Sequence, residues 1–127
     1  MKKKIRYTIL KYKPSILADE SINAGILLND EQTGYSEFYP TTNRERLLNF
    51  DATLTLDSIS LVLDSINKEV RYEVDNNPKG FQLEQFVKYF INAFHFGKIE
   101  NLYVDNDTDA LQLLKKQYLI FDAYNEN

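Results

Sequence analysis

The strongest structural signal lies in two stretches near the start of the chain: KKKIRYTILKYK at residues 2–13 and SINAGILLN at residues 21–29. In the first stretch, Ile5, Tyr7 and Ile9 recur at every second position. This alternation, in a segment rich in β-branched and aromatic residues, predicts a β-strand.

The second stretch predicts another strand, which ends in a turn-rich segment at 29–34. One of its faces carries Ile22, Ala24, Ile26 and Leu28, and the other carries Asn23, Gly25 and Leu27. A third strand is predicted over 34–39. Short connections between these strands predict antiparallel pairing.

Apolar residues at helical spacing dominate the remainder of the chain. They predict helices over 57–71, 83–94 and 108–118, with Gly97 as the stop signal of the second. Thr42 and Glu45 have the spacing of a capping box, which predicts a short helix there. A short strand is predicted over 98–104.

The expected fold class is α+β, with a small antiparallel sheet of three to five strands. Three or four helices are expected to pack mainly on one face of the sheet. The 127 residues suit one domain, over 1–127. Residues 125–127 are expected to form a frayed tail.

Composition excludes several classes of function. The chain has no cysteine and one histidine, which excludes disulfides, thiolate zinc sites and a multi-histidine metal site within one chain. The longest apolar runs are too short to span a membrane. We expect a cytoplasmic protein without metal or cofactor.

The glycines also argue against common enzyme classes. None of the four has the spacing of a phosphate-binding or dinucleotide-binding loop. His95 follows a predicted helical stripe and could act as a general base, because its ordinary pKa lies near neutrality. A histidine at a helix end also has a structural role, since it interacts favourably with the helix dipole.

The acidic run DNDTD at residues 105–109 invites comparison with a calcium loop. An EF-hand loop needs glycine at its sixth position and glutamate at its twelfth, and these positions hold Ala110 and Lys116. We therefore expect a helix start, capped by Asp107 or Thr108.

Basic residues are concentrated in the first strand. Six of the fifteen Lys and Arg residues lie in the first thirteen positions, and the candidate basic surface consists of Lys4, Arg6, Lys11 and Lys13. Such a strand could bind phosphates of a nucleic acid. Alternatively, the lysines protect an exposed strand against edge-to-edge pairing, and the overall charge of −4 makes nucleic acid an unfavoured partner.

One motif suggests a family. The segment YTILKYKP at residues 7–14, followed by ESINAGILL at 20–28, resembles the start of the bacterial family called domain of unknown function 3037. That family has a tyrosine-rich strand and then a Glu-x-x-Asn-x-Gly motif, here Glu20, Asn23 and Gly25. The segment HFGKIE at 95–100 and residues 105–120 resemble its closing pattern.

The resemblance implies that the protein binds another protein rather than catalyses a reaction. Members of the family are often encoded beside HipA-like kinases, which implies an accessory or regulatory protein in a bacterial or phage defence or toxin system. The lysine-, asparagine- and tyrosine-rich composition is consistent with such a source. Because no catalytic motif is present, we expect a non-catalytic protein that binds another protein.

The motif itself has two interpretations. Gly25 can leave a gap beside the pleat, with Asn23 as a hydrogen-bonding group and Glu20 at its entrance, which would form a ligand or partner site. The alternative is a fold-defining set, with Gly25 at a bulge and the polar residues bonding the preceding connection to the sheet. A cleft formed by Glu20 and Asn23 with Arg6 or His95 would serve a small enzyme or ligand-binding domain.

Overall fold

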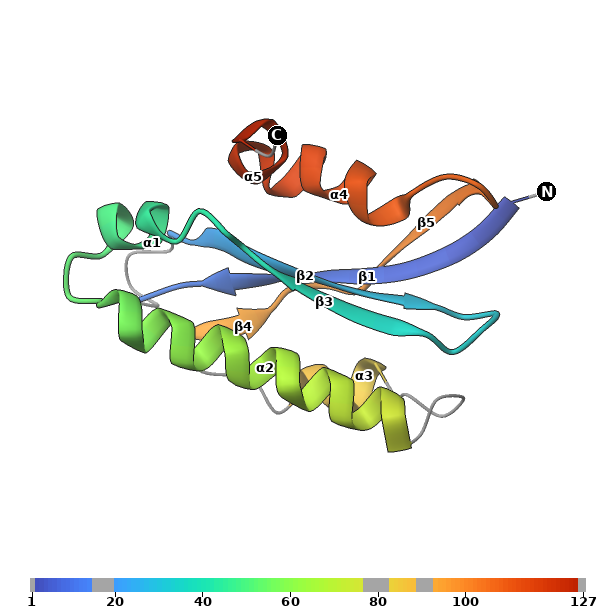
Figure 1. Ribbon diagram of the computed structural model, residues 1–127, viewed down its shortest axis with the longest axis horizontal. Coiled ribbons are helices and arrows are strands. Elements are labelled where there is room, and N and C mark those ends of the chain that lie inside the picture. Colours follow the sequence, from blue (N-terminus) through green and yellow to red (C-terminus); the bar gives the residue numbers. More distant parts are fainter. Residues whose placement is uncertain (1, 15–19, 77–82, 89–92, 126–127) are drawn as a thin grey trace.

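The structure is a computed structural model that describes residues 2–14, 20–76, 83–88 and 93–125 (Figure 1). The elements, in chain order, are β1 (Lys2–Tyr12), β2 (Ile22–Asp30), β3 (Ser36–Pro40), α1 (Glu45–Phe50), α2 (Leu56–Asn76), α3 (Leu83–Lys88), β4 (Phe94–Phe96), β5 (Glu100–Asp105), α4 (Ala110–Tyr118) and α5 (Ile120–Asn125). The predicted frayed tail lies mostly outside the described residues, because only Asn125 of it is included. Among the described residues, no helix has both the length and the apolar character needed to cross a bilayer.

The strands form one antiparallel sheet in the order β3-β2-β1-β4, in which β5 also pairs with β1. The outer side of β1 is shared, because β5 pairs with its first half and β4 with its last residues. The strand predicted with most support from the sequence is therefore the centre of the sheet. The α+β class and the antiparallel sheet are confirmed.

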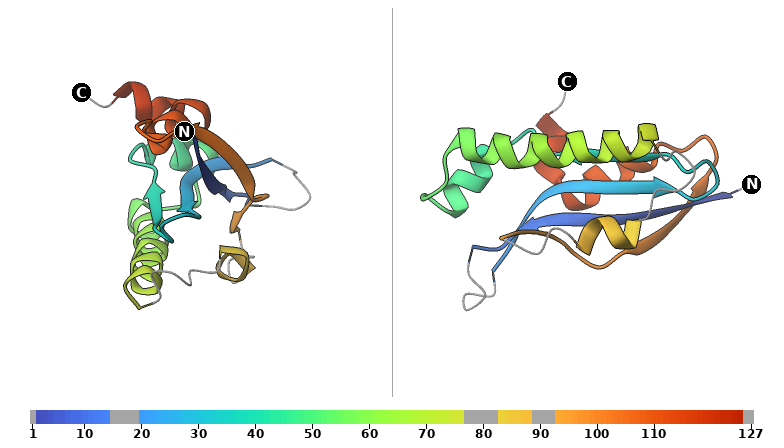
Figure 2. Two further views of the ribbon diagram at one scale, coloured as in Figure 1. Left: turned by 90° about the vertical axis from the view of Figure 1, so that its right-hand side faces the viewer. Right: turned by 90° about the horizontal axis from the view of Figure 1, so that it is seen from below.

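Helices cover both faces of this sheet. Figure 1 shows α2 and α3 below the sheet and α4 and α5 above it, and the end-on view of Figure 2 shows the same separation. The prediction that helices pack mainly on one face therefore holds for α2 and α3. The helices α4 and α5 lie on the opposite face. The prediction did not include α5.

Each face has its own apolar core. The α2-side core contains Leu10, Tyr12, Ala24, Leu27, Phe38, Leu47, Ile59, Leu63, Ile66, Val70, Leu83 and Phe86. The α4-side core contains Ile5, Tyr7, Ile9, Ile26, Leu28, Val104, Ala110, Leu114 and Leu119. The alternation along β1 places Ile5, Tyr7 and Ile9 together, as predicted.

The predicted helix over 83–94 is wrong at its end. Within the described residues the helix covers Leu83–Lys88, residues 89–92 lie outside the description, and Phe94 begins β4. The Phe94 ring lies 4.7 Å from the ring of Tyr12, and its strand pairs with β1. Sheet pairing and aromatic packing therefore outweigh the helical spacing of the sequence.

Both predicted helix caps differ from the observed ones. The N-cap of α1 is Arg44, without a side-chain cap, because the Thr42 hydroxyl donates to Asp122 instead. The N-cap of α4 is Asp109, whose carboxylate accepts from the Gln112 amide at 3.1 Å. The turn before α4 explains this shift, since the Thr108 amide donates to the Asp105 carbonyl.

Candidate functional site

A bulge in β2 determines where the motif residues point. Leu10 pairs with Gly25, but Lys11 pairs with Asn23, so Ala24 is an extra residue in β2. The bulge shifts the alternation by one residue. Ala24 consequently packs in the α2-side core and Ile26 in the α4-side core, although the sequence predicted both on one face.

The same bulge separates Asn23 from Gly25. Gly25 faces the α2 side, where a Cβ atom would lie 2.8 Å from the Phe38 ring. Asn23 faces the α4 side, where its amide reaches Tyr118. The two residues therefore do not border one gap, and the space beside Gly25 is filled by Phe38. Glu20 is exposed just before β2.

Asn23 joins three elements. Its side-chain Nδ2 donates to the Tyr118 carbonyl at the end of α4, at 3.1 Å. Its own backbone carbonyl accepts from Nη2 of Arg46 in α1, at 3.0 Å. We call Asn23, Arg46, Tyr118 and Asp122 the Asn23 cluster. It connects β2 to the helices α1, α4 and α5.

Asp122 fixes α5 in this cluster. Its fully buried carboxylate accepts from the Thr41 hydroxyl and the Thr42 amide, each at 2.8 Å, and from the Tyr39 hydroxyl at 3.2 Å. A buried carboxylate is costly unless several donors satisfy it. The donors come from β3 and the loop after it, so one side chain ties α5 to the far end of that strand.

Arg46 is half-buried and lies within the electrostatic influence of this carboxylate. Burial lowers the pKa of its guanidinium, and the negative charge of Asp122 acts in the opposite direction. Its Cζ atom lies 5.9 Å from the centre of the Phe121 ring, within the range of a cation–π contact. Phe121 is 57% exposed, and its neighbour Ile120 is also exposed. The Asn23 cluster therefore has an apolar and aromatic outer surface.

A pocket of about 200 Å³ adjoins the other side of the cluster. Its lining includes Tyr7, Lys11, Asn23, Glu100 and Tyr118. The hydroxyls of Tyr7 and Tyr118 share a hydrogen bond of 2.9 Å. Burial, followed by this hydrogen bond, raises the pKa of Tyr7 far above its ordinary value, so its hydroxyl serves as a neutral hydrogen-bonding group at physiological pH.

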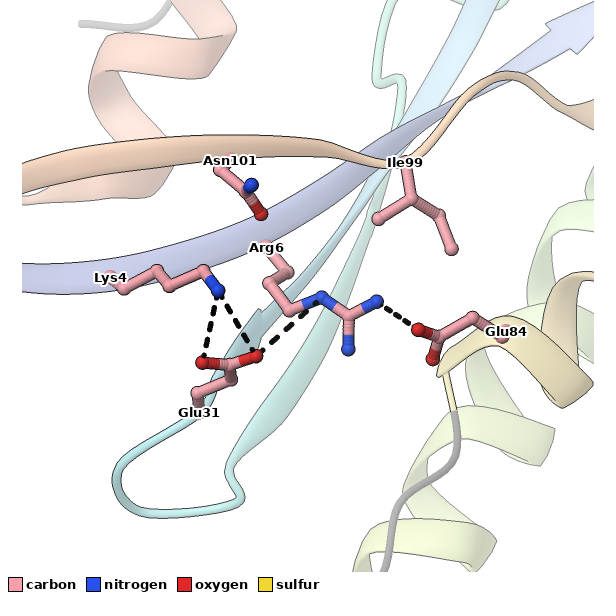
Figure 3. A pocket seen from close by; sticks show the side chains of 6 residues that line it. All are labelled: Lys4, Arg6, Glu31, Glu84, Ile99 and Asn101. Atoms are coloured by element: carbon pink, nitrogen blue, oxygen red, sulfur yellow. Dashed lines mark hydrogen bonds and ion pairs between the residues drawn. The ribbon is translucent and has the colours of Figure 1, made fainter.

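The basic residues of β1 divide between two environments. Lys4 and Arg6 lie on the α3 side in a pocket of about 450 Å³, together with Glu31, Glu84 and Asn101 (Figure 3). Nζ of Lys4 lies 3.4 Å from Glu31, and Arg6 forms ion pairs with Glu31 and Glu84.

These carboxylates neutralise much of the predicted basic surface, which weakens the case for nucleic-acid binding. Lys11 lines the pocket beside Asn23 instead. The backbone amide of Lys13 donates to the Ala93 carbonyl at 2.7 Å.

The predicted cleft with Arg6 does not form, because Arg6 points toward α3 and Asn23 toward α4. His95 lies in β4, opposite Lys11, rather than at a helix end. Sequence reasoning missed Arg46, Tyr118 and Asp122. Only Asp122 had a visible signal, a single carboxylate within the apolar run LIFDAY at residues 119–124.

Comparisons with known proteins place the chain in a family. No curated protein and no solved structure matches it. A family model described as "Protein of unknown function (DUF3037)" matches residues 7–119, from β1 to the residue before α5. The matched range contains Asn23, Arg46 and Tyr118, whereas Phe121 and Asp122 follow it. Since the match covers most of the chain, the protein belongs to the DUF3037 family.

Proposed function

We propose that this protein is a non-catalytic accessory or regulatory protein that acts in the cytoplasm by binding another protein. The observation that carries the proposal is the outward display of Ile120 and Phe121 by α5. The buried hydrogen bonds of Asp122 fix the helix that presents these side chains.

A fixed apolar side chain suits an interface. Binding costs less when the contact residues are already ordered in the free protein, and Asp122 supplies this order. Phe121 lies beside the guanidinium of Arg46. Arginine and aromatic residues are enriched at interfaces, with arginine among the residues that carry most binding energy. A suitable partner has an apolar pocket that receives Phe121. At the edge of this pocket it has a hydrogen-bond acceptor for the neighbouring guanidinium.

The family resemblance suggests the first partner to test. A HipA-like kinase, or another component of a bacterial or phage defence or toxin system, is our candidate. The predicted role is to control the partner by contact, without chemistry of its own.

The test compares matched surface variants. The tagged protein, with Phe121→Ser, Ile120→Ser and Leu61→Ser variants, is purified from its native host after nuclease treatment. Leu61 is the control because it is 70% exposed on α2, away from α5. We expect one stoichiometric partner with the natural chain and with Leu61→Ser, and at least about tenfold less with Phe121→Ser, which corresponds to a loss of about 1.4 kcal/mol.

Binding is then measured with the purified partner by calorimetry. Equal affinity of the natural chain and Phe121→Ser would exclude α5 as the interface. A chain that purifies alone would contradict the accessory role.

A second candidate function is binding of a small molecule in the pocket beside Asn23. It is supported by the meeting of Lys11, Asn23 and the two tyrosine hydroxyls in one space of about 200 Å³. Metabolite screening by NMR, with Lys11→Ala as the comparison, tests it. Chemical-shift changes that are absent in the variant would support a ligand site.

A further inference from the structure

The outer side of β5 is an open edge of the sheet. On its inner side β5 pairs with β1 from Lys2–Asp105 to Tyr7–Glu100. In the part of the chain that the structure describes, no strand pairs with its outer side. The opposite edge of the sheet differs, because α2 packs against β3, and Ser36 and Phe38 are only 4% and 3% exposed.

The hydrogen bonds of β1 reveal which groups of β5 point outward. The Gly97 amide donates to the Ile9 carbonyl, so the odd-numbered residues of β1 bond toward β4 and β5. Because bonding alternates along antiparallel strands, Val104, Leu102 and Glu100 bond inward. The backbone groups of Asn101, Tyr103 and Asp105 therefore point outward.

This edge has only part of the usual protection. Natural edge strands carry charged residues, especially lysine, or proline, or are covered. β5 has two acidic residues but neither lysine nor proline. Within β5, the outward-bonding residues are Asn101, Tyr103 and Asp105, and Tyr103 is 59% exposed. The Asp105 carbonyl already accepts from Thr108, but its amide is directed outward, and a carbonyl has a second lone pair.

We propose that a second copy of this chain pairs with β5 across a two-fold axis at Tyr103. In this antiparallel register, Tyr103 lies opposite the partner's Tyr103. Asn101 lies opposite the partner's Asp105, and Leu102 lies opposite the partner's Val104. Each residue whose backbone groups point outward then lies opposite a residue of the second copy whose backbone groups also point outward. The sheets of the two copies therefore form one continuous sheet.

The side-chain pairs favour this register. The Tyr103 pair is an aromatic cross-strand contact, the Leu102 pair is apolar, and the Asn101 amide can donate to the opposing carboxylate of Asp105. A register centred on Leu102 would instead place Glu100 opposite Val104 and Asp105 opposite Ile99, so both acids would face apolar side chains. A strand pair is a small interface, so the dimer is expected to be concentration-dependent.

Proline at the axis provides the first test. The amide of Tyr103 points outward, so Tyr103→Pro should leave the ladder with β1 intact while it blocks strand addition. Tyr103→Thr retains the amide and a high strand propensity, which separates backbone pairing from the effect of an exposed aromatic ring. Sedimentation over a wide range of concentrations should show a dimer for the natural chain and Tyr103→Thr, but a monomer with an unchanged circular-dichroism spectrum for Tyr103→Pro.

Cysteine crosslinking provides the second test. The chain has no cysteine, so single cysteines report cleanly. In the proposed register the two Tyr103 residues form a hydrogen-bonded pair, and such pairs lie about 5.5 Å apart between Cα atoms. This spacing is within the Cα range of a disulfide. Tyr103→Cys should therefore crosslink to its own copy at least about tenfold faster than Leu61→Cys at micromolar concentration. Asn101→Cys, which has no cysteine opposite it, should crosslink slowly.

The two tests together decide the proposal. A natural chain that stays monomeric at every concentration, with equal crosslinking of Tyr103→Cys and Leu61→Cys, would overturn it. A second outcome would also contradict the proposal. The natural chain could be monomeric and bind a different protein, and Tyr103→Pro could abolish that binding; the edge would then serve another partner. Phe121→Ser should not change dimerisation, so this result is independent of the function proposed for α5.

Discussion

On the α2 side of the sheet, one long amphipathic helix covers apolar residues of β1, β2 and β3. On the α4 side, two short helices combine a smaller apolar core with polar contacts from Tyr7, Asn23 and Asp122. The stabilisation from buried apolar area is spread over many side chains. The stabilisation from a hydrogen bond depends on one donor and one acceptor atom. The α2 side should therefore dominate global stability, and the α4 side should be sensitive to single polar changes.

The largest effect is expected for Leu63→Ala in the α2-side core. Leu63 is fully buried, so the change should remove about 3 kcal/mol from the free energy of unfolding. Leu61→Ala, two residues away on the exposed face of the same helix, should change it by less than about 0.5 kcal/mol. Urea denaturation measures both, and similar losses for the pair would contradict the assignment of the faces.

A smaller but localised effect is expected for Asp122→Ala. It leaves the Thr41 hydroxyl and the Thr42 amide without their buried acceptor, at a cost of about 2 kcal/mol. Hydrogen exchange should show lost protection in α5, with α2 unchanged. Asp64→Ala, which removes an exposed carboxylate on α2, is the control. Uniform loss of protection through both faces would show that α5 is not a separate unit.

Two glycines allow a test of the bulge. Gly25→Ala should cost about 1–2 kcal/mol, because the new methyl group meets the Phe38 ring and the Tyr39 carbonyl. In Gly97→Ala the nearest atom is 3.5 Å from the new Cβ, so little change is expected. Thermal unfolding of the two variants provides the comparison. Equal melting temperatures would mean that the sheet tolerates a side chain at position 25.

Asn23→Ala should cost about 1 kcal/mol, since it removes the hydrogen bond to the Tyr118 carbonyl at the end of α4. The expected signature is a change in the amide shifts of α4 and α5 by NMR. Asn101→Ala, in an exposed position on β5, should leave those shifts unchanged. Shift changes of the same size in both variants would contradict the role of Asn23 in connecting β2 to α4 and α5.

The change in stability expected from Tyr12 is absent at neutral pH and appears only at alkaline pH. Burial, and then the hydrogen bond to Asp51, raises the pKa of Tyr12 to about 12. A group whose folded pKa is raised contributes stability that is complete below its unfolded value, about 10, and is lost as pH rises through the folded value. Stability should therefore decline between about pH 10 and 12. Tyr7, whose pKa is also raised, contributes to the same decline. Tyr12→Phe should therefore reduce the decline in denaturation experiments, and an unchanged slope would contradict the contribution of Tyr12.

The sequence predicted those parts of the fold in which local pattern and packing agree. The stripe through Ile59, Leu63 and Val70 marks α2, and the alternation of Ile5, Tyr7 and Ile9 marks β1. Both patterns persist over several repeats, so one irregular residue does not hide them.

The candidate site was less predictable because it depends on a single irregularity and on distant contacts. One extra residue, Ala24, reverses the face of Asn23 relative to Gly25. Asp122 acquires its role from donors at Tyr39, Thr41 and Thr42, eighty or more residues earlier in the chain. No local pattern records such a contact. The family resemblance identified Asn23 without indicating what its amide binds.

The central position of β1 has a consequence for how the protein is made. This strand leaves the ribosome well before its outer neighbour β5, which begins only at Glu100. Lys3 pairs with Val104, so the long segment between these two residues must be closed into a loop before that contact can form. Contacts of such long range slow folding, because chain entropy is lost before the favourable contact energy is gained. Completion of the sheet therefore waits for β4 and β5, and one flank of the central strand stays open to other chains or chaperones until these two strands have emerged.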